Sequence, residues 1–233
     1  MKTVGIIGGL GPESTVEYYR LIIASYREQR RDGSYPPIII NSIDMTRMRL
    51  LIEAGELAAV TDYLAAEVRR LAAAGADFGA LSANTPHIVF DELLPRSPLP
   101  LTSIVETTCE AAKASGLRRL GLFGTKFTMR AGFYQKTFSR ERMTLVLPDD
   151  TEQDYIHDRY LGELVNGIFL PETRARLLEI ARRLKEEEGI EGLILGGTEL
   201  PLILRETDAD AAGLPLLDTT RIHVKRIVEQ LLS

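Results

Sequence analysis

The feature that most constrains the fold is a regular alternation of short apolar runs with longer segments that carry apolar residues at helical spacing. In the first half, the expected strands are residues 3–7, 37–41 and 78–81, and the expected helices are residues 13–28, a helix from Thr46, and residues 57–74. In the second half, the expected strands are residues 119–123, 144–147 and 192–195, and the expected helices are residues 128–140, 155–167 and 172–188. Strands that alternate with helices in this way predict parallel sheets covered by helices on both faces.

The two halves also match each other in sequence. The matched pairs are residues 4–9 with 120–125, residues 99–104 with 214–219, and residues 82–87 (SANTPH) with 196–200 (GGTEL). We interpret these matches as an ancient duplication, and we expect an α/β fold of two similar flavodoxin-like lobes with parallel sheets and a pseudo-twofold relation. The first lobe is expected to hold residues 1–102 and 216–233, and the second residues 103–215, so that the C-terminal helix returns to the first lobe.

Small polar side chains follow the predicted strands of both halves, namely Asn84 and Thr85, Thr125, and Thr198 with Glu199. Because open α/β sheets bind ligands at the carboxyl ends of their strands, we expect a site in the cleft between the lobes for a small, doubly charged metabolite. Amide and hydroxyl groups can bind a carboxylate or an ammonium without burying a charge of their own. Glu199 either accepts a substrate ammonium or caps a helix.

A glycine-rich turn, residues 8–15 (GGLGPEST), joins the first strand to the first helix. Backbone N–H groups at a helix start can bind a carboxylate or phosphate, which makes Gly9 a candidate binding residue. The alternative is a tight turn in which Ser14 or Thr15 caps the helix. A similar turn recurs in the second half, where we expect Thr128 to be the N-cap and also consider it as a ligand-binding residue.

Three further residues each have two interpretations. Arg47 and Arg49 follow the second strand, and one of them could pair with a distal carboxylate of a substrate; alternatively, both are solvated. His87 could act as a general base, or it could cap or pack the following helix. The spacing of the three histidines fits no metal site, so we expect no metal ion.

Composition excludes several classes of protein. A net charge of −5 argues against nucleic acid as a partner, because phosphate binding needs an excess of Lys and Arg on one face. No apolar run approaches the length of a membrane span, and the start of the chain does not read as a signal peptide, so we expect a cytoplasmic protein without a membrane anchor. The single cysteine, Cys109, excludes an internal disulfide and a cysteine-based metal cluster.

Five segments in this order resemble one family nearly from end to end. They are residues 8–19 (GGLGPESTVEYY), 84–87 (NTPH), 122–129 (LFGTKFTM), Gly196 with 198–200 (TEL), and 217–223 (LDTTRIH). The chain is similar to the cofactor-independent aspartate/glutamate racemases. The resemblance implies two α/β lobes, a site between them for a small acidic amino acid, frequent homodimers, and no pyridoxal phosphate or metal.

The chain departs from the family at its two acid–base positions. Family members use one cysteine directly before the Asn-Thr pair and another before the Thr-Glu pair, and these positions here are Ala83 and Gly197. Neither residue has a side chain that can carry a proton, so the two-cysteine mechanism is not possible, and Cys109 lies too far along the chain to replace either thiol. Glu199 and His87 are the candidate substitutes.

Three functions remain open on this evidence. The first is an enzyme that acts on a small acidic amino acid by proton transfer at Cα with an altered acid–base set, or an isomerase of a related small acid. The second is an inactive binding protein for an acidic amino acid or dicarboxylate, and the third is a structural partner. If the site is otherwise intact, an Ala83→Cys, Gly197→Cys variant is expected to gain racemase activity.

Overall fold

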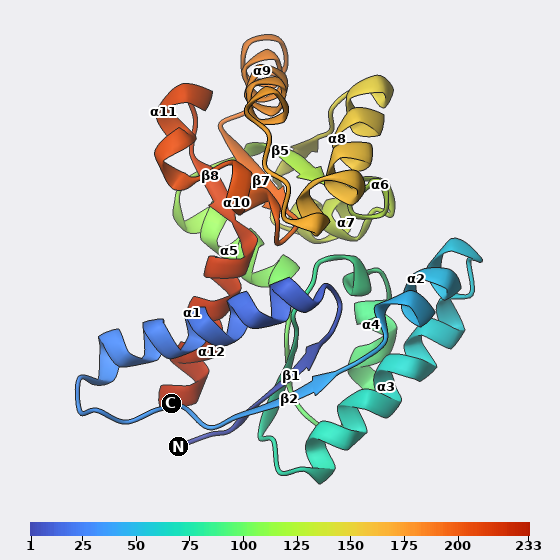
Figure 1. The fold of residues 1–233 in the computed structure, drawn as a ribbon, viewed down its shortest axis with the longest axis vertical. Coiled ribbons are helices and arrows are strands. Elements are labelled where there is room, and N and C mark those ends of the chain that lie inside the picture. The colour runs from blue at the N-terminus through green and yellow to red at the C-terminus, as the bar shows by residue number, and fades with distance from the viewer. The chain divides into compact units, whose positions relative to one another are not determined.

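The computed structural model describes residues 1–205 and 207–233 in full, together with the backbone of residue 206. This part of the chain contains two four-stranded parallel sheets (Figure 1). The first sheet has the order β2 (Ile38–Ser42), β1 (Val4–Gly8), β3 (Phe78–Leu81), β4 (Leu101–Thr102). The second has the order β6 (Thr144–Val146), β5 (Arg119–Gly124), β7 (Gly192–Gly196), β8 (Leu216–Asp218). The identical order of strands in the two sheets agrees with the duplication inferred from the sequence. The contacts divide the chain into two compact units, residues 1–104 with 223–233, and residues 105–222.

The first unit is built on strands β1 (Val4–Gly8), β2 (Ile38–Ser42), β3 (Phe78–Leu81) and β4 (Leu101–Thr102). Its helices are α1 (Pro12–Arg30), α2 (Met45–Glu53), α3 (Leu57–Ala73), α4 (Phe90–Leu93), the 3-10 turns η1 (Thr85–Val89) and η2 (Leu94–Arg96), and most of α12 (Thr219–Leu232). The C-terminal helix therefore returns to the first sheet, as expected, and Val224 and Ile227 lie in the same buried cluster as Ile6 and Ile22.

The alternation of side chains along β1 explains how helices cover both faces of this sheet. Val4 and Ile6 point into the cluster formed with α1 and α12. Gly5 points the other way, where a Cβ atom would lie 2.9 Å from Ala76 Cβ and 3.0 Å from a methyl group of Leu71. The absence of a side chain at Gly5 therefore lets α3 pack closely on the sheet.

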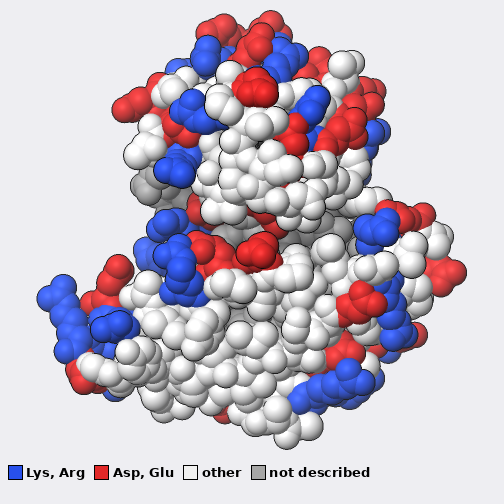
Figure 2. Space-filling model, in the orientation of Figure 1, with Lys and Arg blue, Asp and Glu red and all other residues white. Residues whose placement is uncertain are grey.

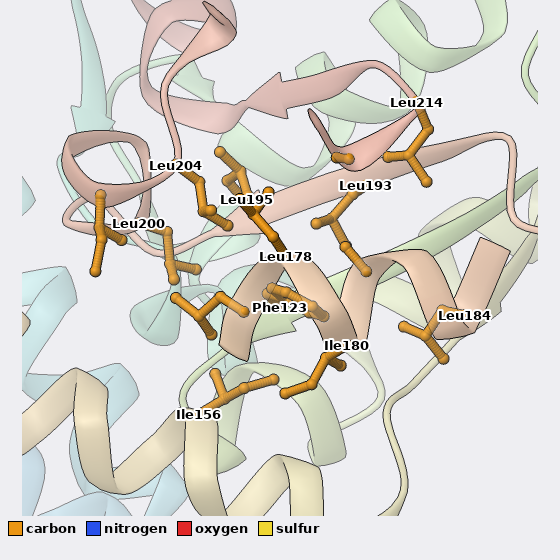
Figure 3. Packing of buried hydrophobic residues seen from close by; sticks show 14 of the residues in the cluster. Phe123, Ile156, Leu178, Ile180, Leu184, Leu193, Leu195, Leu200, Leu204 and Leu214 are labelled. Carbon is orange, nitrogen blue, oxygen red and sulfur yellow. The ribbon is translucent and has the colours of Figure 1, made fainter. Parts of the chain in front are cut away.

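The second unit is built on strands β5 (Arg119–Gly124), β6 (Thr144–Val146), β7 (Gly192–Gly196) and β8 (Leu216–Asp218). Its helices are α5 (Ile104–Ala114), α6 (Lys126–Arg130), α7 (Phe133–Arg140), α8 (Asp150–Gly162), η3 (Leu164–Asn166), α9 (Pro171–Glu188), α10 (Leu200–Ile203), η4 (Glu206–Asp208) and α11 (Ala209–Ala212). Side chains from α8, α9 and β7 meet in one buried core, with Ile156, Leu178 and Leu195 among them (Figure 3).

Two of the differences from the sequence-based expectation have a clear physical reason. Residues 128–140 form two helices instead of one, because Gly132 has a φ of 81° and ends the helical path between α6 and α7. The chain returns to the first unit at residue 223 instead of 216, because residues 216–218 form β8 and pair in parallel with β7. Strand pairing depends on tertiary contacts, which the local pattern of residues does not specify.

The surface carries charges of both signs. Figure 2 shows Lys and Arg side chains beside Asp and Glu on the visible face. The ion pairs of the described residues include that of Arg49 with Glu53 at 2.7 Å. Among the described residues, no helix has both the length and the apolar character needed to cross a bilayer.

Candidate active site

The tip of β3 in the first unit is held in place by two serines. The Ser82 hydroxyl donates to the carbonyl oxygen of Ile7 at 3.0 Å, and the Ser14 hydroxyl donates to the carbonyl oxygen of Ser82 at 2.6 Å. Ala83 and Asn84 follow directly, and both are buried. The position at which the family resemblance implies a thiol is therefore fixed in the structure but carries only a methyl group.

His87 is fully engaged with the main chain. Its Nε2 accepts a hydrogen bond from the Ile104 N–H at 3.3 Å, so Nδ1 carries the proton and donates to the Ala83 carbonyl oxygen at 3.0 Å. The ring stacks on Phe90 with a centroid distance of 4.8 Å. Burial lowers the pKa of His87 to about 3. This geometry favours the packing interpretation over the general base, because a neutral imidazole with both nitrogens occupied has no free lone pair.

The glycine-rich turn is closed by a side chain. Gly9 has a φ of +77°, and a Cβ atom there would clash with the backbone of Ile43. The Gly9 N–H donates to the Thr15 hydroxyl at 2.8 Å. Helix α1 begins after Gly11 without a side-chain cap, so neither Ser14 nor Thr15 caps it. The geometry favours a tight turn, since the N–H of Gly9 is already bound within the turn.

Arg47 lies on the exposed side of α2, with its guanidinium 4.4 Å from the ring centroid of Tyr63. Arg49 pairs with Glu53, one turn further along the same helix. In the described structure, Arg49 therefore has an ion-pair partner and Arg47 lies over the Tyr63 ring, both within the first unit.

In the second unit, Thr125 follows β5 and caps α6. Its hydroxyl oxygen accepts a hydrogen bond from the Thr128 N–H at 3.3 Å. The prediction that Thr128 is the N-cap was wrong, because the strand ends at Gly124 and the helix begins directly after Thr125. Thr128 is buried, and its side chain packs close to Gly124.

A buried carboxylate lies after the tip of β7. The Thr198 hydroxyl donates to Glu199 Oε2 at 2.7 Å, and the Tyr160 hydroxyl, from α8, donates to the same oxygen. Thr198, Glu199 and Tyr160 are 8%, 5% and 7% exposed. Glu199 occupies the N-cap position of α10, as the capping alternative placed it, but its side chain makes no capping hydrogen bond to that helix. Among the described residues, no Lys, Arg or His pairs with this carboxylate, so two hydroxyl groups are its only protein partners there.

The ring of Tyr160 fills the space beside Gly197. A Cβ atom built on Gly197 would lie 2.5 Å from Tyr160 Cε2 and 2.8 Å from its hydroxyl oxygen. A cysteine at position 197 therefore has no room unless the tyrosine moves. Sequence reasoning missed Tyr160. The one signal available was its place four residues after Ile156, on the side of a predicted helix that faces the core.

The other candidates for chemistry lie elsewhere. Cys109 is buried in α5, and burial is the main cause that raises the pKa of its thiol to about 11. Among the described residues, no three His, Cys, Asp or Glu side chains are grouped so that they could hold a metal ion.

The site residues described above lie within the part of the chain that is similar to known proteins. A family model described as Asp/Glu/Hydantoin racemase matches residues 7–227. The broad specificity amino-acid racemase RacX of Bacillus subtilis is 23% identical over 245 residues, which span 99% of this chain and 98% of that protein. Among solved structures, a candidate Asp/Glu racemase from Yersinia pestis has a TM-score of 0.92 at 31% identity. An aspartate racemase homologue from Pyrococcus horikoshii OT3 has a TM-score of 0.87 at 34% identity. Both structures match over 100% of this chain and 100% of their own.

The matched residues include both strand tips described above, and the two-lobed α/β fold is shared with the solved relatives. This chain belongs to the Asp/Glu/hydantoin racemase family.

Proposed function

We propose that this chain moves the Cα proton of a small acidic amino acid, with Glu199 as the acid–base group in place of a family cysteine. The observation that carries the proposal is the buried Glu199 carboxylate, which follows the family's thiol position at Gly197. The relatives suggest the substrate class, because one is named an amino-acid racemase and another an aspartate racemase homologue.

The proposed step breaks the Cα–H bond of the substrate. The proton goes to the Glu199 carboxylate, and the electron pair stays on the substrate, delocalised from Cα into its own carboxylate. Return of the proton from Glu199 to Cα completes the cycle, so no oxidant or reductant is needed. An ordinary carboxylate is a weaker base than a thiolate by about 4 pKa units, so we expect slower turnover than a cysteine pair would give.

Racemisation needs a proton carrier on each face of Cα, and the two units differ in what they offer. The first unit has a methyl group at Ala83 and a neutral His87 whose two nitrogens bind the main chain. We therefore propose proton exchange that strongly favours one enantiomer, with little inversion.

Neutral groups at three strand tips supply the substrate contacts in this proposal. They are Asn84 and Thr85 after β3, Thr125 and Thr128 after β5, and Thr198 after β7.

We also propose a homodimer, which sedimentation velocity would test.

The alternative is a binding protein for an acidic amino acid or dicarboxylate that has lost turnover. Ala83 and His87 favour this alternative. Ala83 carries only a methyl group, and both nitrogens of His87 bind the main chain, so neither side chain is a free acid or base after β3. An isomerase of a related small acid would use the same chemistry as the main proposal.

The test is deuterium exchange. The protein is incubated in D₂O with each enantiomer of aspartate and of glutamate, and deuterium at Cα is followed by NMR. We expect exchange above background with one enantiomer, and a loss of about 10²- to 10⁴-fold in Glu199→Gln. Glu172→Gln is the matched control, since Glu172 is exposed in the first turn of α9.

A thermal shift with the same four amino acids separates the two candidates. A shift without any exchange would support the binding protein and refute the enzyme. Neither a shift nor exchange would refute both.

A further inference from the structure

We propose that the Tyr160 hydroxyl stands in the place of the missing thiol at position 197 and carries the proton between the substrate Cα and Glu199. This inference rests on the proposed function and names a second catalytic residue for the same reaction. It comes from α8, a helix that contributes no motif to the family resemblance described above.

The first support is the position of the tyrosine. The hydroxyl oxygen lies 2.8 Å from the point where Cβ of residue 197 would be, and the ring edge lies 2.5 Å from it. A thiol sulfur is bonded directly to Cβ, so the phenol oxygen occupies the region that a cysteine side chain would reach. The second proton carrier of the family is thus replaced in space by a residue distant in sequence.

The second support is the hydrogen-bond chain. The Tyr160 hydroxyl donates to Glu199 Oε2, and the Thr198 hydroxyl donates to the same oxygen at 2.7 Å. Burial, reinforced by the charge of Glu199, raises the pKa of Tyr160 well above its usual value, so the phenol stays protonated. A protonated phenol can accept the Cα proton only as a relay: its oxygen takes that proton while its own proton passes to Glu199.

The step is balanced. The Cα–H bond and the phenol O–H bond break, new O–H bonds form at Tyr160 and at Glu199, and the electron pair of Cα stays on the substrate. The reverse transfer restores the carboxylate. Thr198 keeps its hydrogen bond to Oε2 throughout and is a positioning residue.

A purely structural role does not explain the arrangement. A phenylalanine at 160 would fill the space beside Gly197 equally well and would need no polar partner. Burying a carboxylate with two hydroxyl groups as its protein partners is unfavourable, and such groups concentrate at functional sites. The pairing of a tyrosine with this glutamate therefore indicates chemistry.

The decisive variant is Tyr160→Phe, with Tyr155→Phe on the same helix as its control. Tyr155 is partly exposed, and Arg159 lies over its ring. We expect Tyr160→Phe to slow Cα deuterium exchange by about 10²-fold or more while the ligand-induced thermal shift persists. Tyr155→Phe should leave both unchanged.

Exchange by Tyr160→Phe within twofold of the wild-type rate would overturn the relay and leave the proposed function standing, with Glu199 acting directly. Absence of exchange in the wild-type protein would overturn both.

A second measurement tests the geometry without turnover. Gly197→Ala is made in the wild-type chain and in a Tyr160→Ala chain, and the melting temperatures of all four proteins are compared. We expect the substitution to lower the melting temperature by several degrees in the wild type and to be tolerated once the ring is gone. Equal losses in both backgrounds would show that the ring does not occupy the thiol's place, and the inference would fail.

Discussion

Mild acid is predicted to destabilise this protein through two buried histidines of the first unit. In His223, Nδ1 accepts a hydrogen bond from the Tyr18 hydroxyl at 2.8 Å, and the Nε2–H donates to the Thr102 carbonyl oxygen at 3.0 Å. His87 is held equally firmly in its neutral form. Burial lowers the pKa of His87 to about 3 and that of His223 to about 4.

The sign follows from proton binding. In the unfolded chain each histidine has a pKa of about 6.5, so below this pH the unfolded state binds protons that the folded state does not bind. Stability is therefore complete above pH 6.5 and is lost as the pH falls toward the folded values of about 3 and about 4. One pH unit below 6.5, each histidine costs about 1.4 kcal/mol, so the pair costs about 3 kcal/mol at pH 5.5. This is a large part of a typical stability of about 5–15 kcal/mol.

The assay is urea unfolding at pH 7.5 and at pH 5.5. Ordinary carboxylates titrate near pH 4, so they contribute little in this window. His87→Gln removes one titrating group and should reduce the pH dependence to about half, whatever it does to the absolute stability. A change smaller than about 1 kcal/mol in the wild type would contradict the reasoning.

NMR gives a direct check, because the chain has only three histidines. The imidazole signals of His87 and His223 should not move between pH 7.5 and 5.5. Partial burial also lowers the pKa of His157 from its usual value. A native-state midpoint near 6.5 for His87 or His223 would refute the assigned burial.

Three further predictions concern single positions. Gly197→Cys alone should destabilise the protein and bring no racemase activity, because the Tyr160 ring fills the space beside Gly197. Gly197→Cys combined with Tyr160→Ala gives the thiol room, so this variant should exchange Cα deuterium faster than Tyr160→Ala alone. This result revises the expectation that a cysteine can be added at position 197 without a second change. Gly9→Ala should lower the free energy of unfolding, measured in urea, by about 2 kcal/mol or more, because position 9 combines a left-handed φ with a backbone clash. Gly33→Ala is the control: Gly33 has a similar φ but open space around it, so the loss should be about 1 kcal/mol. Thr125→Ala should cost about 1 kcal/mol through loss of the α6 cap, and Thr125→Ser should restore most of it.

The sequence by itself determined the alternation of strands and helices, and it located the ends of the six predicted strands to within one residue. Strand β3 occupies the predicted residues Phe78–Leu81, and the tips after β3 and β7 carry the polar residues expected there. These features depend on the periodicity of apolar residues and on neighbours along the chain, which are local properties. The loss of both family thiols, at Ala83 and Gly197, was likewise visible in the residues themselves.

Only the tertiary structure decided what each polar group does. His87 has its two nitrogens occupied by backbone groups on either side of it in sequence, Ala83 and Ile104, and the fold brings the latter to it. Tyr160 reaches Glu199 and the space beside Gly197 because α8 packs on the sheet that β7 belongs to. Such contacts join residues far apart in the chain, and their partners are set by the packing of whole helices and strands, so no local pattern could have revealed them.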